Sequence, residues 1–242
     1  VRAFQDSSDF FYFRSERRLE YCQAFNLLAR NAIADGADFL FIVNSDTRDF
    51  SELFFEELLQ SFDRDSRLGI CGSAVDSFDG IHLHSEPVNR LWTTFPTPTE
   101  GYLVKSAAWV RVGGFRERLY RYTEDILLFR DLYSFGYTGA TNPRVRFSHL
   151  GGGSSSKQLF VPEFYRIRNA IMLIRLSKRS VHQRAQMMAG WSSSHKKRIG
   201  SEWSQRRYLK SAARLISFLL GTAVGTLTPI RLISRDLDPL GG

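Results

Sequence analysis

The sequence predicts an α/β fold in which a mixed sheet is flanked by helices and followed by a helical, basic extension. Helical and strand-like segments alternate up to about residue 150, which is typical of helices packed on a sheet. A glycine- and serine-rich hinge, residues 151–156, then interrupts the pattern, and the chain beyond it is helical and basic. We therefore expect a first domain at 1–156 and an extension at 157–242.

The first elements are a strand, a helix and a second strand. Residues 10–13 are aromatic in succession and predict a short strand. Residues 19–34 predict a helix, ended by Asp35 and Gly36, because apolar residues recur on one face, namely Phe25, Leu28, Ala29, Ala32 and Ile33. Residues 39–43 form an apolar run, which predicts a strand buried on both faces of a mixed or parallel sheet.

The middle of the first domain continues this alternation. Ser51 can cap a helix that runs to about Phe62, and residues 68–75 predict a strand. Residues 76–100 contain three prolines and scattered aromatic residues, so we expect an irregular excursion that forms a wall of the site. Residues 101–104 predict the next strand.

The end of the first domain is a helix followed by strands. Thr123 can cap a helix that runs to about Phe135, and Gly136 ends it. Residues 137–140 and 145–147 predict two short strands. In the extension, helices are predicted at 163–176 and at 208–220.

The net charge of the chain changes sign at the same boundary, residue 156, as the predicted fold. Residues 1–156 hold 17 Lys and Arg against 21 Asp and Glu, a net charge of −4. Residues 157–242 hold 16 Lys and Arg against 4 Asp and Glu, a net charge of +12. Such a segment is expected to meet nucleic acid or an anionic membrane surface. No nucleic-acid-binding motif occurs in its expected context, so we expect the membrane surface and no nucleic acid. The two cysteines are too few for a disulfide framework and favour a reducing compartment.

The basic extension contains an uncharged, largely apolar run at residues 215–230. This run has 16 residues, whereas a spanning helix needs about 20, and glycine and proline interrupt it. We interpret it as an interfacial amphipathic segment beside basic residues that can face anionic lipid. The alternative is a helix packed on the first domain or on a second subunit.

Two polar residues are candidates for holding a divalent cation. Asp46 follows the apolar strand at 39–43, at the edge of the sheet where α/β proteins bind ligands. A carboxylate there suits Mg²⁺ or Mn²⁺ with substrate phosphates completing the shell, although Asp46 could instead cap the next helix. His149 could complete a Mn²⁺ shell or pack structurally, and the 151–156 run could wrap phosphates or be a linker.

An acidic pair opens the helix after Thr123. Glu124 and Asp125 are adjacent, so their side chains point in different directions and one can face a site. A carboxylate near an anomeric carbon can take the proton of an acceptor hydroxyl. The alternative is that both acids only interact favourably with the helix dipole.

Taken together, these residues resemble the family-two glycosyltransferases, in particular the bacterial rhamnosyl- and galactofuranosyl-transferase-like branch. The resemblance covers about residues 10–175. The matching positions are Asn26, Asn44-Ser45-Asp46, Gly113-Gly114-Phe115, Glu117, Glu124-Asp125, Arg130, Gly136-Tyr137 and His149.

The resemblance implies a GT-A fold, a nucleotide-sugar donor such as a UDP- or dTDP-sugar, a divalent metal and inversion at the anomeric carbon. It implies that Asp46 and His149 contact the metal or the diphosphate, and that Asp125 is the general base with Glu124 supporting it. It assigns donor or acceptor binding to Asn44, Gly113, Gly114, Phe115 and Arg130. It also implies a glycan or lipid-linked acceptor and a peripheral position at the cytoplasmic face of the plasma membrane.

The sequence departs from this family in three ways. Asn44 replaces the first acid of the metal triplet, so Asp46 is its only acid. Arg116 stands where the family usually has Asp. The first βαβ unit, which holds the nucleobase, is expected to be missing. A truncated or degenerate transferase domain that binds a glycan or a membrane without catalysis is therefore the alternative hypothesis.

Overall fold

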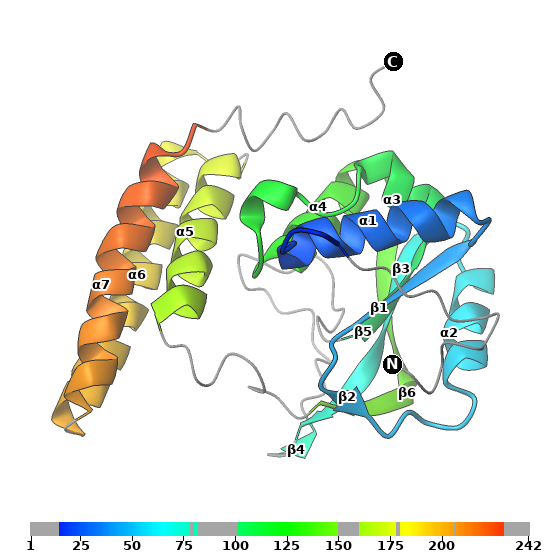
Figure 1. Cartoon of the computed structure of the whole chain (residues 1–242), viewed down its shortest axis with the longest axis horizontal. Helices are drawn as coiled ribbons and strands as arrows, with labels where there is room; N and C mark the ends of the chain where they lie inside the picture. The colour runs from blue at the N-terminus through cyan, green and yellow to red at the C-terminus, as the bar shows by residue number, and fades with distance from the viewer. Residues whose placement is uncertain are drawn as a thin grey trace.

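The fold is mixed α/β, as the sequence predicts. The computed structural model describes residues 15–77, 80–81, 101–149, 160–177, 180–205 and 207–229. Within them, a sheet covered by helices on both faces is followed by a bundle of three helices (Figure 1). We call residues 15–149 the sheet half and the three later helices the bundle.

The sheet combines antiparallel and parallel pairs. Its strands are β1 (Phe39–Val43), β2 (Thr47–Arg48), β3 (Leu68–Ser77), β4 (Gly80–Ile81), β5 (Gly101–Lys105) and β6 (Thr138–His149). Their order is β1-β5-β3-β6-β2, and β4 pairs with β3 outside this path. Only the β3–β6 pair is parallel among the pairs described. The antiparallel pairs make the sheet mixed rather than parallel.

Helices cover both faces of the sheet because the apolar side chains of its strands point alternately to one face and the other. The helices of the sheet half are α1 (Tyr21–Ala34), α2 (Phe54–Asp63), α3 (Ser106–Val112) and α4 (Glu124–Ser134), with a short 3-10 helix η2 (Glu117–Leu119). In β1, Leu40 and Ile42 join the core that contains residues of α1, α3 and α4. Phe39 and Phe41 face the opposite way and pack against the cluster around α2. Successive side chains of a strand point to opposite faces, which explains this division.

Several local predictions are corrected by the structure. The helix predicted from Ser51 begins later, at Phe54, and Ser51 Oγ instead accepts a hydrogen bond from Arg146 N at 3.3 Å. Thr123 does precede α4, but its side chain makes no capping hydrogen bond. The two strands predicted at 137–140 and 145–147 are one strand, β6, which begins at Thr138 and whose register with β3 shifts between Ser73 and Ala74. The predicted strand at 10–13, the hinge at 151–156 and most of the 76–100 excursion lie outside the described residues.

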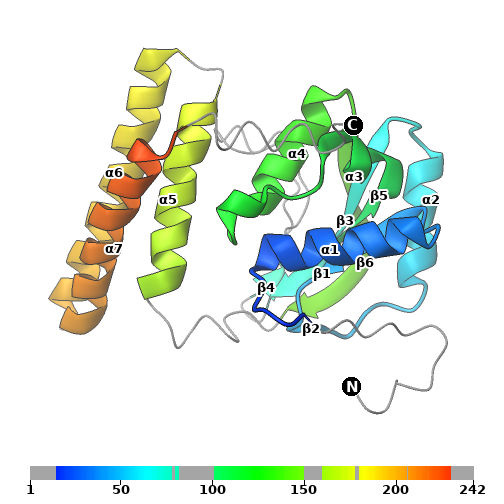
Figure 2. The same ribbon diagram turned by 45° about the horizontal axis from the view of Figure 1, so that its top comes forward.

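The bundle consists of α5 (Phe160–Leu176), α6 (Val181–Ser204) and α7 (Tyr208–Leu227). In both ribbon views α5 lies between the sheet half and the other two helices (Figures 1 and 2). Met172 and Leu173 of α5 belong to the same apolar core as α1, α3 and α4. The bundle is therefore joined to the sheet half through α5. The residue-156 boundary predicted from sequence falls outside the described residues.

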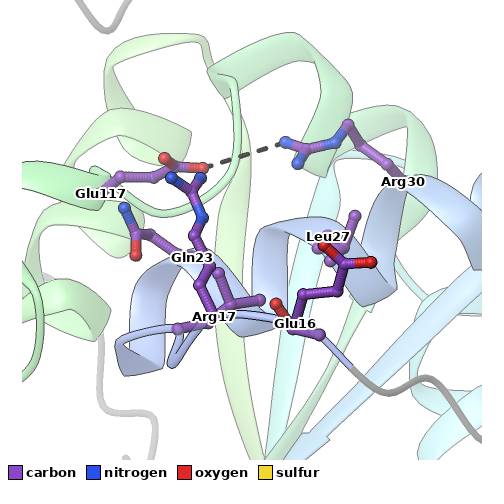
Figure 3. Close-up of a pocket in the computed structure, with 8 residues that line it drawn as sticks. Glu16, Arg17, Gln23, Leu27, Arg30 and Glu117 are labelled. Atoms are coloured by element: carbon purple, nitrogen blue, oxygen red, sulfur yellow. Dashed lines mark ion pairs between the residues drawn. The ribbon is translucent and has the colours of Figure 1, made fainter.

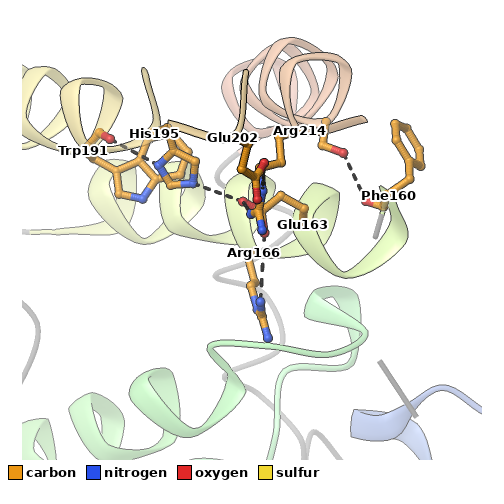
Figure 4. Close-up of polar contacts among 8 residues, drawn as sticks. Phe160, Glu163, Arg166, Trp191, His195, Glu202 and Arg214 are labelled. Atoms are coloured by element: carbon orange, nitrogen blue, oxygen red, sulfur yellow. Dashed lines mark hydrogen bonds and ion pairs between the residues drawn. The ribbon is translucent and has the colours of Figure 1, made fainter. Parts of the chain in front are cut away.

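A buried ionic network joins the three helices of the bundle (Figure 4). Glu163 of α5 lies 2.9 Å from Arg214 of α7 and 3.6 Å from His195 of α6. Arg214 also contacts Glu202 of α6 at 2.6 Å. The hydrogen bond from His195, together with the charge of Arg214, lowers the pKa of Glu163 to about 2. A carboxylate held in this way pairs with the buried guanidinium and keeps the three helices in register.

Candidate active site

Asp46 and His149 lie side by side at one end of the sheet. Asp46 Oδ1 is 3.1 Å from His149 Nε2, although the two residues are far apart in sequence. Asp46 follows β1, and His149 is the last residue of β6, where it pairs with Thr47 of β2. Their side chains are 28% and 20% exposed. The pair is accessible from solvent while two strands hold its backbone in place.

Tyr21 lies beside this end of the sheet. Its hydroxyl donates to Asn44 Oδ1 at 3.4 Å, and the carbonyl of Asn44 accepts a hydrogen bond from Thr47 Oγ1 at 2.8 Å. Asn44 therefore sits at the start of a fixed turn that leads from β1 to Asp46. Tyr21 opens α1 and brings that helix to the same turn.

The acidic pair lies near Tyr21 as well. Negative charge on Glu124 and Asp125 contributes, after burial, to raising the pKa of Tyr21 and of Cys22. The same two charges contribute to the raised pKa of Tyr102, whose main cause is complete burial. Tyr21 and Cys22 of α1 share one apolar core with Ile126 and Leu127 of α4, so the starts of the two helices meet in that core. Tyr21 thus contacts Asn44 directly and is influenced by the charges of the acidic pair.

Glu124 is held in an environment that disfavours its ionisation. Burial is the main cause that raises its pKa, and the neighbouring charge of Asp125 adds to it, giving a pKa of about 8. Its Oε2 is buried and has no hydrogen-bond partner among the described residues. Asp125 differs, since its Oδ1 accepts a hydrogen bond from Ile126 N at 2.7 Å. Two adjacent carboxyls in different environments can carry different protonation states at neutral pH, as general acid–base chemistry requires.

We expect Glu124 to make the folded state less stable as pH rises. Below its ordinary pKa of 4.5 the carboxyl is protonated in both the folded and unfolded states. Between about pH 4.5 and about pH 8 only the unfolded state releases the proton. The free energy of unfolding therefore falls by at most about 1.4 kcal/mol per pH unit. Glu124→Gln removes this contribution. Denaturant unfolding of both proteins from pH 5 to pH 9 measures it, and parallel curves would contradict the buried neutral carboxyl.

A strained loop precedes the acidic pair. Tyr120, Tyr122 and Thr123 have φ values of 64°, 65° and 66°, which side-chain-bearing residues rarely adopt. Such residues persist only where the surroundings hold them. Asn169 of α5 does so here, because its Nδ2 lies 2.8–3.1 Å from the carbonyl oxygens of Leu119, Arg121 and Tyr122. The bundle therefore positions the loop that leads into Glu124.

Gly113, Gly114 and Phe115 form a rigid turn after α3. The two glycines have φ values of 79° and 69°. A Cβ on Gly114 would lie 2.7 Å from Asn26 Oδ1, so no larger residue fits. The Asn26 amide pairs with both backbone groups of Phe115, accepting at 2.9 Å and donating at 2.7 Å. These contacts explain the glycines by backbone packing, and Phe115 is buried.

Arg130 is paired within its own helix. Its Nη2 lies 3.2 Å from Asp131 Oδ1, and Arg116 Nη2 lies 2.6 Å from the other oxygen of the same carboxylate. Arg116, which departs from the family pattern, is thus a partner of a buried carboxylate shared by two guanidinium groups. Among the described contacts of Arg130, the ion pair is with Asp131 and not with Glu124 or Asp125.

A shallow pocket of about 530 Å³ lies beside the N-terminal half of α1 (Figure 3). Its lining includes Glu16, Arg17, Arg30 and Glu117, and Arg30 and Glu117 face each other at 3.9 Å. The lining contains none of the site residues predicted from sequence. Opposite charges balance across it, so this pocket shows no preference for an anionic ligand.

The Asp46–His149 pair fits a divalent cation by its donor chemistry. One carboxylate oxygen and one imidazole nitrogen, 3.1 Å apart, can share one ion, and this mixed donor set suits Mn²⁺. Within the part of the chain that is described, no group of three or more His, Cys, Asp or Glu side chains could hold a metal. An ion at this pair would therefore take further ligands from substrate phosphates.

Comparison with known proteins gives no match to any protein-family model and none to any curated protein. The site must be judged on its own residues. Sequence reasoning missed Tyr21 and Asn169. Only Asn169 left a signal, because a lone amide stands between the apolar residues Ile167 and Ile171 of a helix, where a buried polar group needs partners.

Proposed function

We propose that this protein is a metal-dependent, inverting glycosyltransferase with a GT-A-type catalytic domain. The observation that carries the proposal is the contact between Asp46 and His149 at the sheet edge, at 3.1 Å. The acidic pair that opens α4 adds, after burial, to the raised pKa of Tyr21, whose hydroxyl contacts Asn44. Transfer from a nucleotide sugar needs a cation at the leaving diphosphate and a carboxylate that takes the proton of the acceptor, and these two groups of residues would supply them.

Asp125 is the general base of the proposed reaction. The acceptor hydroxyl oxygen forms a bond to the anomeric carbon while its proton passes to Asp125. The bond between that carbon and the donor diphosphate breaks, and the nucleoside diphosphate leaves with the electron pair. Protonated Glu124 limits the negative charge near the acceptor and can donate a hydrogen bond. Attack from the side opposite the leaving group inverts the anomeric centre.

Asp46 and His149 would hold the metal ion with the donor diphosphate. When bound, the cation offsets negative charge that develops on the leaving diphosphate. The turn from Asn44 to Thr47 fixes Asp46, and the β2–β6 pairing fixes His149. Both ligands are thus oriented before donor binding. The donor is proposed to be a UDP- or dTDP-sugar and the acceptor a glycan or lipid-linked glycan at the cytoplasmic membrane face.

We expect the metal to be needed for donor binding, and Asp46→Ala to weaken metal-supported binding at least about tenfold, as loss of groups around a metal commonly does. Calorimetric titration with UDP and with dTDP, with and without Mn²⁺, measures the affinity. Asp49→Ala is the matched control, because Asp49 directly follows β2, three residues after Asp46, is 64% exposed and pairs only with the neighbouring Arg48 among the ion pairs described.

Each outcome of this titration is informative. Metal-dependent binding that is lost in Asp46→Ala and kept in Asp49→Ala supports the transferase site and identifies the donor base. Equal affinity in all three proteins removes Asp46 from the site. Absence of binding by the unaltered protein would favour the alternative of a domain that is not catalytic in this form.

A further inference from the structure

Helix α7 is inverted relative to an ordinary surface helix. Its inward face carries small or polar residues that are buried, namely Ser211, Arg214, Ser217, Gly221 and Gly225. Its outward face carries exposed large apolar residues, namely Leu209, Leu215, Ile216, Leu219, Leu220, Val224 and Leu227. Folded proteins usually bury large apolar side chains. A continuous exposed apolar surface of this kind therefore marks an interaction site.

The inverted orientation of α7 is fixed by its close approach to α5. A Cβ on Gly221 would lie 2.6 Å from Ile167 Cγ2, and one on Gly225 would lie 2.7 Å from the carbonyl of Arg168. Arg175 of α5 donates to the carbonyl of Gly225 at 2.6 Å. Rotation of α7 to bury its leucines would drive them into this seam, where only glycine fits. Small residues in helix seams and large apolar residues outside are typical of helices that face lipid.

The charge of the bundle restricts what can cover this face. The described residues from 160 to 229 include ten Lys and Arg but only two acids, Glu163 and Glu202. Both acids are used internally, since each pairs with Arg214 (Figure 4). Lys196, Lys197, Arg207 and Lys210 are exposed. The bundle region therefore carries exposed cations as well as an apolar face, and none of the described ion pairs joins Glu163 or Glu202 to these four cations.

We propose that the outward face of α7 docks on the surface of a membrane that contains anionic lipid. The apolar side chains would enter the interface between headgroups and acyl chains, and the exposed cations would contact the headgroups. A second copy would bring another cationic bundle against the first, which charge repulsion opposes. No helix of the described residues is long and apolar enough to cross a bilayer. The inference rests on the bundle alone and does not depend on the proposed transferase activity.

Vesicle cosedimentation of the full chain tests this docking. We expect binding to vesicles of mixed phosphatidylglycerol and phosphatidylcholine, and at least about tenfold weaker binding to phosphatidylcholine alone. The variant Ile216→Gln/Leu219→Gln/Leu220→Gln should lower partitioning onto the anionic vesicles by at least about tenfold. These three side chains are 50%, 58% and 47% exposed, so polar replacement should preserve the fold. Circular dichroism and thermal unfolding check that it does.

Two further variants keep the test decisive. Leu53→Gln/Phe55→Gln/Leu59→Gln replaces residues around α2 that are 61%, 49% and 41% exposed, and it should bind vesicles like the unaltered protein. Leu209→Gln/Leu227→Gln changes the two most exposed large apolar side chains of α7, at 88% and 79%, and serves if the triple variant loses its fold.

Three results would overturn the proposal. The first is vesicle binding that both α7 variants retain in full. The second is equal binding to neutral and anionic vesicles, which would remove the role of the cations. The third is a dimer in sedimentation velocity that the α7 variants dissociate, without vesicle binding, since that result would assign the face to a second copy of the chain.

Discussion

Asp125→Asn is expected to lower the rate of sugar transfer by about 10²- to 10⁴-fold, which is the usual contribution of a positioned general base. The amide cannot take the proton of the acceptor hydroxyl. Its oxygen can still accept the hydrogen bond from Ile126 N, now 2.7 Å from Asp125 Oδ1, so the start of α4 should be preserved. Donor affinity should therefore change little, because the lost group acts on the acceptor.

Two measurements separate the roles in this variant. Release of nucleoside diphosphate from the donor, with an extract that contains lipid-linked acceptors, gives the rate. Calorimetry gives the donor affinity, and Asp49→Asn, at an exposed position after β2, is the control. Turnover that survives in Asp125→Asn would assign the base elsewhere. A loss of donor affinity as large as the loss of rate would instead make Asp125 a binding residue.

Asn169→Ala is expected to lower the free energy of unfolding by roughly 3 kcal/mol, since each buried polar group left unpaired costs about 1–3 kcal/mol. Three carbonyl oxygens, of Leu119, Arg121 and Tyr122, lose the amide that now lies within 3.1 Å of them. The positive φ values of the same loop would then relax. Because the loop leads into Glu124, the rate of transfer should fall as well.

Asn142→Ala provides a comparison for that effect. The Asn142 amide donates to the carbonyl of Glu57 at 3.0 Å and to Ser61 Oγ at 3.1 Å, on the α2 face of the sheet. This variant should lose stability but keep the transfer rate of its folded fraction. Denaturant unfolding gives the loss of stability in each variant. Transfer rates measured well below the unfolding transition show whether the variant also affects catalysis. If Asn169→Ala cost less than about 1 kcal/mol, the amide would not be what holds the loop.

Elements with strong local signals were predictable from sequence. The strand at 39–43 was predicted with its observed bounds because five apolar residues follow the helix-ending Asp35 and Gly36. The helix at 208–220 was predicted in place but too short, since α7 continues through Gly221 and Gly225 to Leu227. Glycine has a low helix propensity, so its presence predicts the end of a helix. Here the close contact between α7 and α5 requires glycine, and tertiary packing overrides the local preference.

Two helices had no signal that periodicity could detect. In α6 only Met187 is a buried residue, so the sequence carries no apolar stripe, and the capping box of Ser180 and Gln183 was the available clue. In α3 seven residues make fewer than two full repeats of an apolar face, which is too short to distinguish from a strand.

The candidate site was predictable only in part, because its residues meet through long-range contacts. Asp46 and His149 lie 3.1 Å apart because β2 pairs with the end of β6, a long-range contact that only the resemblance suggested. Local sequence does not specify which distant polar residue will be a partner. Arg130 illustrates this limit, because its guanidinium contacts Asp131 rather than the acidic pair.

The contribution of α5 to the sheet half also has a consequence for how the chain folds as it is synthesised. Met172 and Leu173 complete the core that contains α1, α3 and α4, yet they are made after the whole sheet, whose last strand ends at His149. Domains generally fold as units during synthesis, N-terminal first. Here the nascent chain must carry an open apolar surface until α5 emerges from the ribosome, and we expect chaperones to bind it during that interval.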